Sequence, residues 1–443
     1  MIMRLFRQFF LTTFRVGFLL GVIPVLSLLA RADSLPQPSA AGFEHVVVVM
    51  MENRSFDHFL GWMPGANGQQ SGLSYQDSKG VSHSTHALPP DYQGCGFLDP
   101  GHSYENGRVQ YHNGGADGWL LDGSDGDETD PNRANDIYAI GYYGQSDLAF
   151  LGAAGPAFTV CDNYFAGILS ATYPNRFYMH AAQTDRLSNS SDISTLPTIW
   201  SRLEEKGFSG RYYFSDLPFL ALWGSRYTNI SKPISQFLVD AGNGTLPNVA
   251  FIDPRFGGED QGISNDDHPH ADIRNGEVFL NQIYDALRNS PNWSKTVLII
   301  TYDEWGGFFD HVPPPLAPIP PASAAAGDTD GRLGFRVPCV IISPYVRHNY
   351  IAHGQYDHTS ILKMIEWRFG LTPLSNRDGT ANNLAEVLNL AAPDASAPAF
   401  TVPAGPFGNA CAPLANDPEA AEWAENLKQL RALALKYGFQ GAQ

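Results

Sequence analysis

Several common sequence motifs are missing from this chain, and each absence argues against a class of site or reaction. No two cysteines stand in a CxxC arrangement, which argues against a cysteine-based zinc site. No phosphate loop of the GxxxxGK[ST] kind is present, so nucleotide-driven phosphoryl transfer is not supported. Internal repeats and long linker-like runs are also missing. The length alone permits one large domain or two ordinary ones, and the missing linker favours one large α/β domain.

Basic residues are in short supply. The sequence has 28 Lys and Arg against 45 Asp and Glu, for a formal net charge of −17. Such a balance argues against nucleic acid as the main partner and against electrostatic adhesion to anionic membranes. A protein this acidic that acts on an anionic phosphate needs local positive charge, which a bound metal ion can supply.

The first 32 residues have the composition of a secretory signal peptide. Arg4, Arg7 and Arg15 are followed by a mostly apolar run over 16–29, and Ala30-Arg31-Ala32 has the form of a cleavage site. We therefore predict a signal peptide over 1–32 and a single domain over 33–443, secreted or periplasmic and without a stable membrane span after cleavage. A retained membrane anchor is the alternative, although the apolar run is short for a span. No Arg-Arg pair supports a twin-arginine route.

Only four cysteines are present. Cys161 and Cys339 fall within apolar, strand-like runs, so we expect them to be buried as small hydrophobic residues. Cys95 and Cys411 lie in surroundings rich in Gly and Pro, and disulfides are permitted in an exported protein. They are the better disulfide candidates, although the sequence does not assign the pairing.

Acidic and amide side chains follow two predicted buried strands, at the point where each strand ends. Glu52 and Asn53 follow the valine-rich run 43–51, and Asp303 and Glu304 follow the apolar run 295–300. Ligands of open α/β sheets gather at the carboxyl ends of strands, and these oxygens suit a hard cation. The alternative is a pair of ordinary turns whose acids face water.

A threonine stands at the start of a predicted helix. In the sequence TYPNRFYMHA, Pro174 is placed as a first-turn proline, with Thr172 or Tyr173 near the helix cap. A hydroxyl at this place feels the positive end of the helix, which attracts phosphate. Thr172 is therefore a candidate nucleophile, and the alternative is a plain threonine cap.

The remaining segments alternate between strand and helix patterns. We expect further strands near 207–214, 246–254 and 336–344, and helices over 195–206, 275–289, after 356–360 and over 418–437. Residues 138–150 are also expected to be helical. This alternation predicts an α/β fold with a mostly parallel sheet, whose loops gather along one edge. Three histidines fall in such loops: His102, His268 and His311.

Four long motifs in the same order resemble a known family. MENRSFDHFLG (51–61), TYPNRFY (172–178), DEWGGFFDHV (303–312) and RVPCVIISP (336–344) are similar to the motifs of the phosphoesterase family of bacterial phospholipases C and acid phosphatases, to which plant non-specific phospholipases C are related. The resemblance runs from about 45 to 378. It implies an alkaline-phosphatase-like α/β/α sandwich.

The resemblance also implies roles for the candidate residues. Glu52, Asn53, Thr172, Asp303 and Glu304 would hold a divalent metal ion, for which their oxygens favour calcium or magnesium. Thr172 would also be the nucleophile, and His102, His268 and His311 would stabilise the phosphate or protonate the leaving group. The family usually has a second proline after His268-Pro269, where this chain has His270, so His270 stays outside this set.

We expect an exported, metal-dependent phosphoric-ester hydrolase of the phospholipase C type, which cleaves a phosphodiester of the phospholipid head-group type through a phospho-threonine intermediate. An acid phosphatase acting on monoesters would use the same residues. A non-catalytic surface binding protein is a third possibility, although no expected ligand or nucleophile is missing. A sulfatase would need a Cys or Ser precursor of formylglycine, which Thr172 cannot be.

Overall fold

The computed structural model describes residues 35–121, 136–411 and 417–442. Its centre is an eight-stranded sheet in the order β13-β6-β12-β11-β1-β10-β8-β9. Strand β12 is antiparallel to both of its neighbours and the other pairings are parallel. The strands are β1 His45–Met51, β6 Thr159–Cys161, β8 Gly210–Phe214, β9 Ser231–Pro233, β10 Val249–Asp253, β11 Thr296–Tyr302, β12 Cys339–Ile342 and β13 Tyr350–Ala352.

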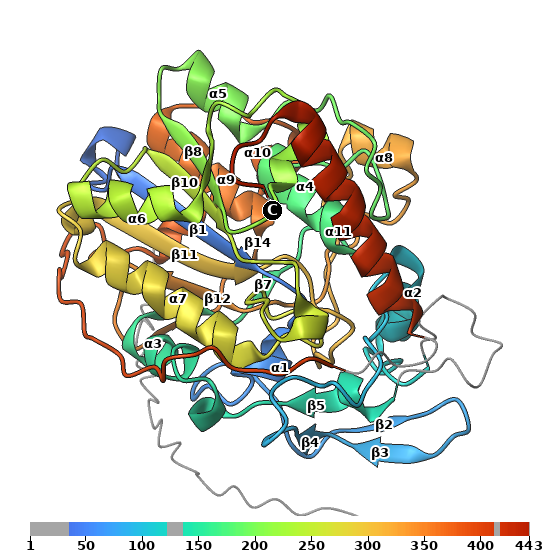
Figure 1. Ribbon diagram of the computed structural model, residues 1–443. Coiled ribbons are helices and arrows are strands. Elements are labelled where there is room, and N and C mark those ends of the chain that lie inside the picture. Colours follow the sequence, from blue (N-terminus) through green and yellow to red (C-terminus); the bar gives the residue numbers. More distant parts are fainter. Residues whose placement is uncertain (1–34, 122–135, 412–416, 443) are drawn as a thin grey trace, which may run out of the picture. The chain divides into compact units, whose positions relative to one another are not determined.

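The two central strands are buried along their whole length. Every residue of β1 and of β11 is buried, as expected for β-branched runs covered by helices on both faces of a parallel sheet. Helices cover both faces: Tyr213 of β8 packs on Phe237 of α6, whereas its neighbour Tyr212 points to the opposite face and packs near His180 of α4. This arrangement confirms the predicted α/β/α sandwich with a mostly parallel sheet (Figure 1).

Helices pack against one another on each face of the sheet. On one face α6 packs on α7, and on the other α4 packs on α5 and α9. The helices are α1 Phe56–Leu60, α2 Tyr104–Tyr111, α3 Leu151–Ala157, α4 Thr172–Ala181, α5 Ile199–Glu205, α6 Ile234–Asn243, α7 Ile273–Arg288, α8 Pro321–Ala326, α9 His358–Phe369, α10 Asn376–Thr380 and α11 Pro418–Tyr437.

Residues 65–121 are largely irregular apart from three short strands between 74 and 87, α2 and a 3-10 turn at 112–114. Three two-stranded pairs lie outside the main sheet: β2 Ser74–Gln76 with β3 Ser82–Ser84, β4 His86–Ala87 with β5 Gly141–Tyr142, and β7 Tyr164–Phe165 with β14 Tyr356–Asp357. The helix expected over 138–150 is wrong. That stretch forms two short 3-10 turns around β5, which pairs with β4 instead of continuing a helix.

The four cysteines are paired or buried as the residues around them predict. Cys95 and Cys411 form a disulfide, and Cys161 and Cys339 are buried and free. The disulfide links the segment that precedes α11 to the irregular segment that precedes α2, across 316 residues.

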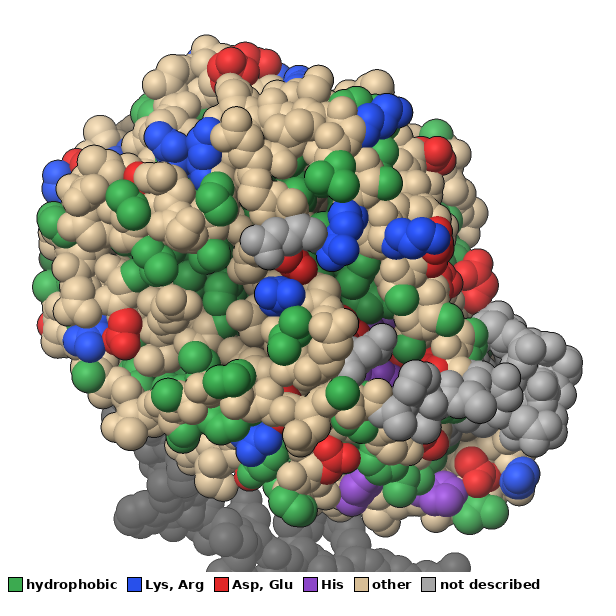
Figure 2. All heavy atoms as spheres, viewed as in Figure 1, with side chains coloured by type: hydrophobic (Ala, Val, Ile, Leu, Met, Phe, Trp, Pro, Cys, Tyr) green, Lys and Arg blue, Asp and Glu red, His purple; other side chains and the backbone are tan. Residues whose placement is uncertain are grey.

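Residues 36–443 group into one compact unit, and the predicted signal peptide lies outside the described residues. Within the described ranges, no helix is both long and apolar enough to cross a membrane. Of the side chains described on the face in Figure 2, Lys and Arg are scattered among other types and do not gather into one continuous patch.

A buried glutamate on α7 makes stability depend on pH. Burial raises the pKa of Glu277 to about 8, and its Oε2 accepts the N–H groups of Phe150 and Leu151. The folded pKa lies above the unfolded value, so the folded state binds more protons between these two pKa values. Stability should therefore fall as pH rises from about 4.5 to about 8.

Glu277→Gln removes this dependence while keeping an acceptor for both N–H groups. We expect the variant to gain roughly 2–4 kcal/mol on the wild type between pH 4.5 and pH 8. Denaturant unfolding at both pH values measures this difference, and Glu204→Gln, at an exposed position of α5, is the matched control. Equal pH slopes for the wild type and Glu277→Gln would contradict the argument.

Candidate active site

The carboxyl ends of three neighbouring strands bring acidic side chains together. Glu52 and Asn53 follow β1, Asp303 and Glu304 follow β11, and Asp253 is the last residue of β10. Strand β1 pairs in parallel with both β10 and β11, so the three ends meet at one edge. All five side chains are fully buried. The two strand-end pairs therefore meet as expected, and Asp253 adds a fourth carboxylate.

The turn after β11 depends on glycine, as its sequence indicates. Gly306 and Gly307 both have positive φ, at 62° and 70°. A Cβ atom at Gly306 would lie 2.3 Å from the Asn53 carbonyl oxygen, and one at Gly307 would lie 2.6 Å from the Gly101 carbonyl oxygen. Only glycine fits both the backbone and the space, which lets this turn pack directly against Asn53.

Arg176 lies among three of the four strand-end carboxylates. Its Nη2 is 2.6 Å from Glu52 Oε1, its Nη1 is 2.7 Å from Asp253 Oδ1, and its Nε is 3.0 Å from Asp303 Oδ2. The guanidinium is buried and carries one positive charge against three carboxylates. Arg176 and Asp253 were absent from the predicted set. The available signals were the position of Arg176 four residues after Thr172 and that of Asp253 at the end of a strand.

Thr172 is the first residue of α4, one turn before Arg176 on the same side of the helix. Its side chain is 1% exposed, and its Oγ1 has no hydrogen-bond partner among the described residues. The N-cap position belongs to Ala171, and no side chain caps this helix. The capping alternative therefore does not account for the threonine, whose hydroxyl remains available for chemistry.

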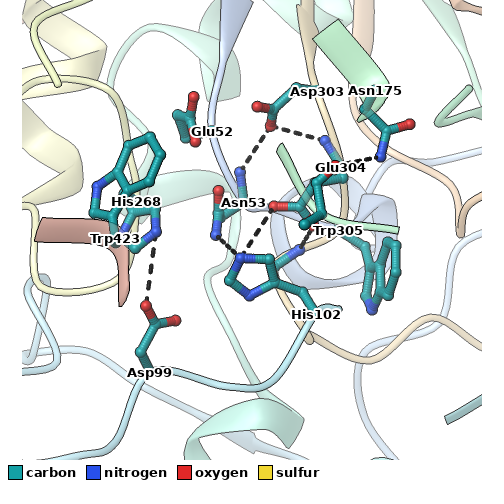
Figure 3. Close-up of polar contacts among 12 residues, drawn as sticks. Glu52, Asn53, Asp99, His102, Asn175, His268, Asp303, Glu304, Trp305 and Trp423 are labelled. Atoms are coloured by element: carbon teal, nitrogen blue, oxygen red, sulfur yellow. Dashed lines mark hydrogen bonds and ion pairs between the residues drawn. The ribbon is translucent and has the colours of Figure 1, made fainter. Parts of the chain in front are cut away.

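His102 contacts the strand-end group directly. Its Nε2 lies 3.3 Å from Asn53 Nδ2 and 4.0 Å from Glu304 Oε1 (Figure 3). Its Nδ1–H donates to the Pro100 carbonyl at 2.9 Å, which leaves Nε2 with the lone pair. Burial, helped by the nearby charge of His268, lowers the pKa of His102 to about 4. His102 is thus held neutral, with an accepting nitrogen at the site.

His268 has the opposite electrostatic surroundings. Its Nδ1 is 3.2 Å from Glu259 Oε2 and its Nε2 is 3.6 Å from Asp99 Oδ2. Burial disfavours a charged imidazole, but the carboxylates of Glu259 and Asp99 outweigh it and raise the pKa of His268 well above its usual value. The rings of His268 and His102 are 6.2 Å apart between centroids, so a proton donor and a proton acceptor stand side by side.

His311 lies in a different cluster from the other predicted histidines. Its Nδ1 is 2.5 Å from Asp57 Oδ2, and its Nε2 is 3.2 Å from Asn67 Oδ1. Asp57, Asp310 and His311 are near enough to one another to hold a metal ion. However, Arg336 already donates to Asp57 at 3.2 Å and to Asp310 at 2.9 Å. This arrangement is better described as a satisfied ion-pair cluster.

His270 also lies apart from the strand-end group. Its Nε2–H donates to the Phe97 carbonyl at 2.9 Å, in the region held by the disulfide. His270 belongs to the loop before α7, and its φ is 75°.

The strand-end group fits a hard divalent cation. Four buried oxygens have no hydrogen-bond partner in the part of the chain that is described: Glu52 Oε2, Asn53 Oδ1, Thr172 Oγ1 and Glu304 Oε1. Burial, and next the charge of Asp303, raises the pKa of both Glu52 and Glu304 well above the usual range. Buried, unpaired oxygens with excess negative charge are the donor set that calcium or magnesium prefers.

A pocket opens beside this group. It has a volume of about 290 Å³, and His102 and Ala171, the neighbour of Thr172, form part of its wall. Further wall residues come from α2 and from α11, among them Asn106, Pro418 and Glu422. The pocket therefore borders the residue that directly precedes the candidate nucleophile.

The chain is similar to known proteins over most of its length. Residues 43–372 match the model of the Phosphoesterase family. The chain belongs to the phosphoesterase family. This confirms the resemblance that the four motifs indicate, and it makes the protein an enzyme, a hydrolase of phosphoric esters.

Individual relatives from plants and bacteria are similar over most of the chain. Non-specific phospholipase C1 of Arabidopsis thaliana is 31% identical over 78% of this chain and 70% of its own length. Phospholipase C B of Mycobacterium tuberculosis is 32% identical, over 79% and 78%. Among solved structures, a protein of the alkaline phosphatase superfamily from Vibrio parahaemolyticus is 10% identical, with a TM-score of 0.38 over 89% of this chain and 88% of its own.

Proposed function

We propose that the protein is an exported, metal-dependent phosphodiesterase of the phospholipase C type that uses Thr172 as its nucleophile. The observation that carries this proposal is the unpartnered Thr172 hydroxyl at the start of α4, one turn before the arginine that contacts Glu52 and Asp303. The relatives named phospholipase C support a phospholipid as the substrate.

The reaction proceeds in two steps at Thr172. The threonine oxygen attacks phosphorus, the bond from phosphorus to the leaving oxygen breaks, and a phospho-threonine forms. Water then attacks this phosphorus, which restores the hydroxyl and releases the phosphorylated head group. The positive end of the α4 dipole lies at Thr172 and favours a negatively charged phosphate there.

Two histidines accept and donate the protons in these steps. His102 is neutral with a lone pair on Nε2, so it accepts a proton, whereas His268 has N–H groups to donate to the leaving oxygen. Neighbouring groups whose pKa values are pushed apart are typical of acid–base pairs. His311, in its separate ion-pair cluster, has no part in these steps.

Glu52, Asn53, Thr172, Asp303 and Glu304 would hold the divalent cation, which supplies positive charge for the phosphate and polarises it. Dialysis against a chelator should therefore reduce turnover to background, and added Mg²⁺ or Ca²⁺ should restore it and raise the melting temperature. Activity assays and elemental analysis of the purified protein measure both effects.

Two variants tell the two carboxylate clusters apart. Glu304→Gln should lose the bound metal, whereas His311→Gln, in the cluster of Asp57 and Asp310, should keep it. Full activity in a metal-free protein, or loss of the metal only in His311→Gln, would contradict the assignment.

A substrate pair separates the leading function from the acid phosphatase alternative. Release of diacylglycerol from phosphatidylcholine vesicles is compared with release of phosphate from a simple aryl phosphate at equal enzyme concentration. We expect the phosphodiester to be turned over faster. An inert phospholipid together with rapid turnover of the monoester would replace the phospholipase with a phosphatase.

Export rests on residues 1–32. In a bacterial expression host, the protein recovered outside the cytoplasm should begin at Asp33, which N-terminal sequencing can determine. An intact N-terminus in the membrane fraction would indicate the retained anchor instead.

A further inference from the structure

Helix α11 lies outside residues 43–372, the part of the chain that matches the family, yet it reaches the candidate active site. Its Trp423 is 6% exposed and its ring stacks on His268, with centroids 5.0 Å apart and planes 8° apart. Figure 3 shows the two rings side by side, on the same side of the site as Asp99. One face of the imidazole is therefore fixed by a residue from beyond the matched region.

The indole also acts on the edge of the imidazole, through Glu259. Trp423 Nε1–H donates to Glu259 Oε1 at 2.6 Å, and the other oxygen of this carboxylate, Oε2, lies 3.2 Å from His268 Nδ1. Trp423 therefore contacts both the imidazole of His268 and the carboxylate of Glu259, and Glu259 in turn orients that imidazole. Fixed partners of this kind determine which nitrogen of a histidine faces the substrate.

The other nitrogen of His268 is left for chemistry. Its Nε2 is buried and has no hydrogen-bond partner within the described residues, although Asp99 Oδ2 is 3.6 Å away. The ring of His102, which contacts Asn53 of the strand-end group, lies 6.2 Å from the ring of His268 between centroids. A leaving oxygen bound at this group would meet Nε2.

Helix α11 is itself held close to the nucleophile. The Tyr173 hydroxyl donates to the Asn426 carbonyl at 3.2 Å, and Tyr173 is the residue directly after Thr172. Trp423 also packs edge-on against Phe256, and the Cys95–Cys411 disulfide lies shortly before α11 in the chain. The hydrogen bond between Tyr173 and Asn426 therefore holds α11 against the start of α4.

We infer that Trp423 and Glu259 are positioning residues that hold His268 in the orientation needed to protonate the leaving group, so that α11 completes the active site. This inference rests on the proposed function, because it takes His268 as the proton donor. It predicts that removing the indole affects most the substrates that need a proton on the leaving oxygen.

The experiment compares two phosphodiesters of choline: p-nitrophenyl phosphorylcholine, whose leaving group needs little protonation, and phosphatidylcholine, whose alcohol needs it. Trp423→Ala should lower kcat for phosphatidylcholine about 10- to 100-fold with little change in KM, and lower kcat for the aryl ester much less. Trp423→Phe keeps a ring against His268 and should recover part of the loss. Glu259→Gln keeps an acceptor for the indole and should show the same dependence on the leaving group.

Leu430→Ala is the matched control, because Leu430 is a buried residue of the same helix outside the site. It should lower the melting temperature while leaving both kcat values unchanged. The inference is overturned if Trp423→Ala retains wild-type kcat on both esters, or if it loses the same factor on both. If Trp423→Ala does not fold, Trp423→Phe and Glu259→Gln decide by the same ratio.

Failure of the inference and failure of the proposed function give different results. A wild type that cleaves neither ester, or a Thr172→Ala variant as active as the wild type, removes the proposed function. An active wild type, an inactive Thr172→Ala and an unaffected Trp423→Ala remove only the role of α11.

Discussion

Replacing Thr172 with alanine is expected to reduce kcat by at least about 10⁴-fold, because the variant lacks the hydroxyl proposed to attack phosphorus. Its Oγ1 has no hydrogen-bond partner among the residues that the structure describes, and it does not cap α4, so stability should change by no more than about 1 kcal/mol. Steady-state assays on phosphatidylcholine and a thermal melt measure the two quantities.

Thr172→Ser is the matched variant, since it keeps a hydroxyl at the same atom and removes only a methyl group. It should retain measurable turnover, while Thr172→Ala falls to background. Comparable activity in Thr172→Ala and the wild type would show that another group attacks the phosphorus.

Replacing Arg176 with methionine is expected to destabilise the metal-free protein by about 3–5 kcal/mol. The variant leaves the buried carboxylates of Glu52, Asp253 and Asp303 without the guanidinium that contacts each of them. Removing one partner of a buried ion pair is costly because the remaining charge stays unpaired away from water. Denaturant unfolding in the presence of a chelator measures the loss.

Arg176→Lys tests whether geometry matters beyond charge. Lysine keeps the positive charge but cannot reach three carboxylates with a planar fork, so it should recover only part of the stability. A loss below about 1 kcal/mol in Arg176→Met would mean that the carboxylates are protonated or otherwise neutralised in the folded state.

Much of this site could be predicted because its residues follow strands with strong patterns. The valine run before Glu52 and the apolar run before Asp303 read as buried parallel strands, and the ends of such strands meet for topological reasons. The helix predicted over 418–437 matches α11 for a similar reason, because its pattern is long and local.

The residues that were not predicted depend on tertiary contacts. An arginine in a helix is ordinarily exposed, so nothing local indicates that Arg176 is buried among Glu52, Asp253 and Asp303. The contact of Trp423 with His268 could not be predicted for the same reason, because the two residues are 155 positions apart and α11 could have packed elsewhere. The helix expected over 138–150 failed because two of its residues pair with β4, which overrides the local preference.

The central claim is a covalent bond between phosphorus and Thr172, and rapid acid quenching tests it most directly. The enzyme is mixed with excess p-nitrophenyl phosphorylcholine, quenched within one turnover, digested, and its peptides are analysed by mass spectrometry. The account predicts a phosphorylcholine adduct on the peptide that contains Thr172, which Thr172→Ala does not form. An adduct on another residue, or turnover with no adduct at all, would contradict it.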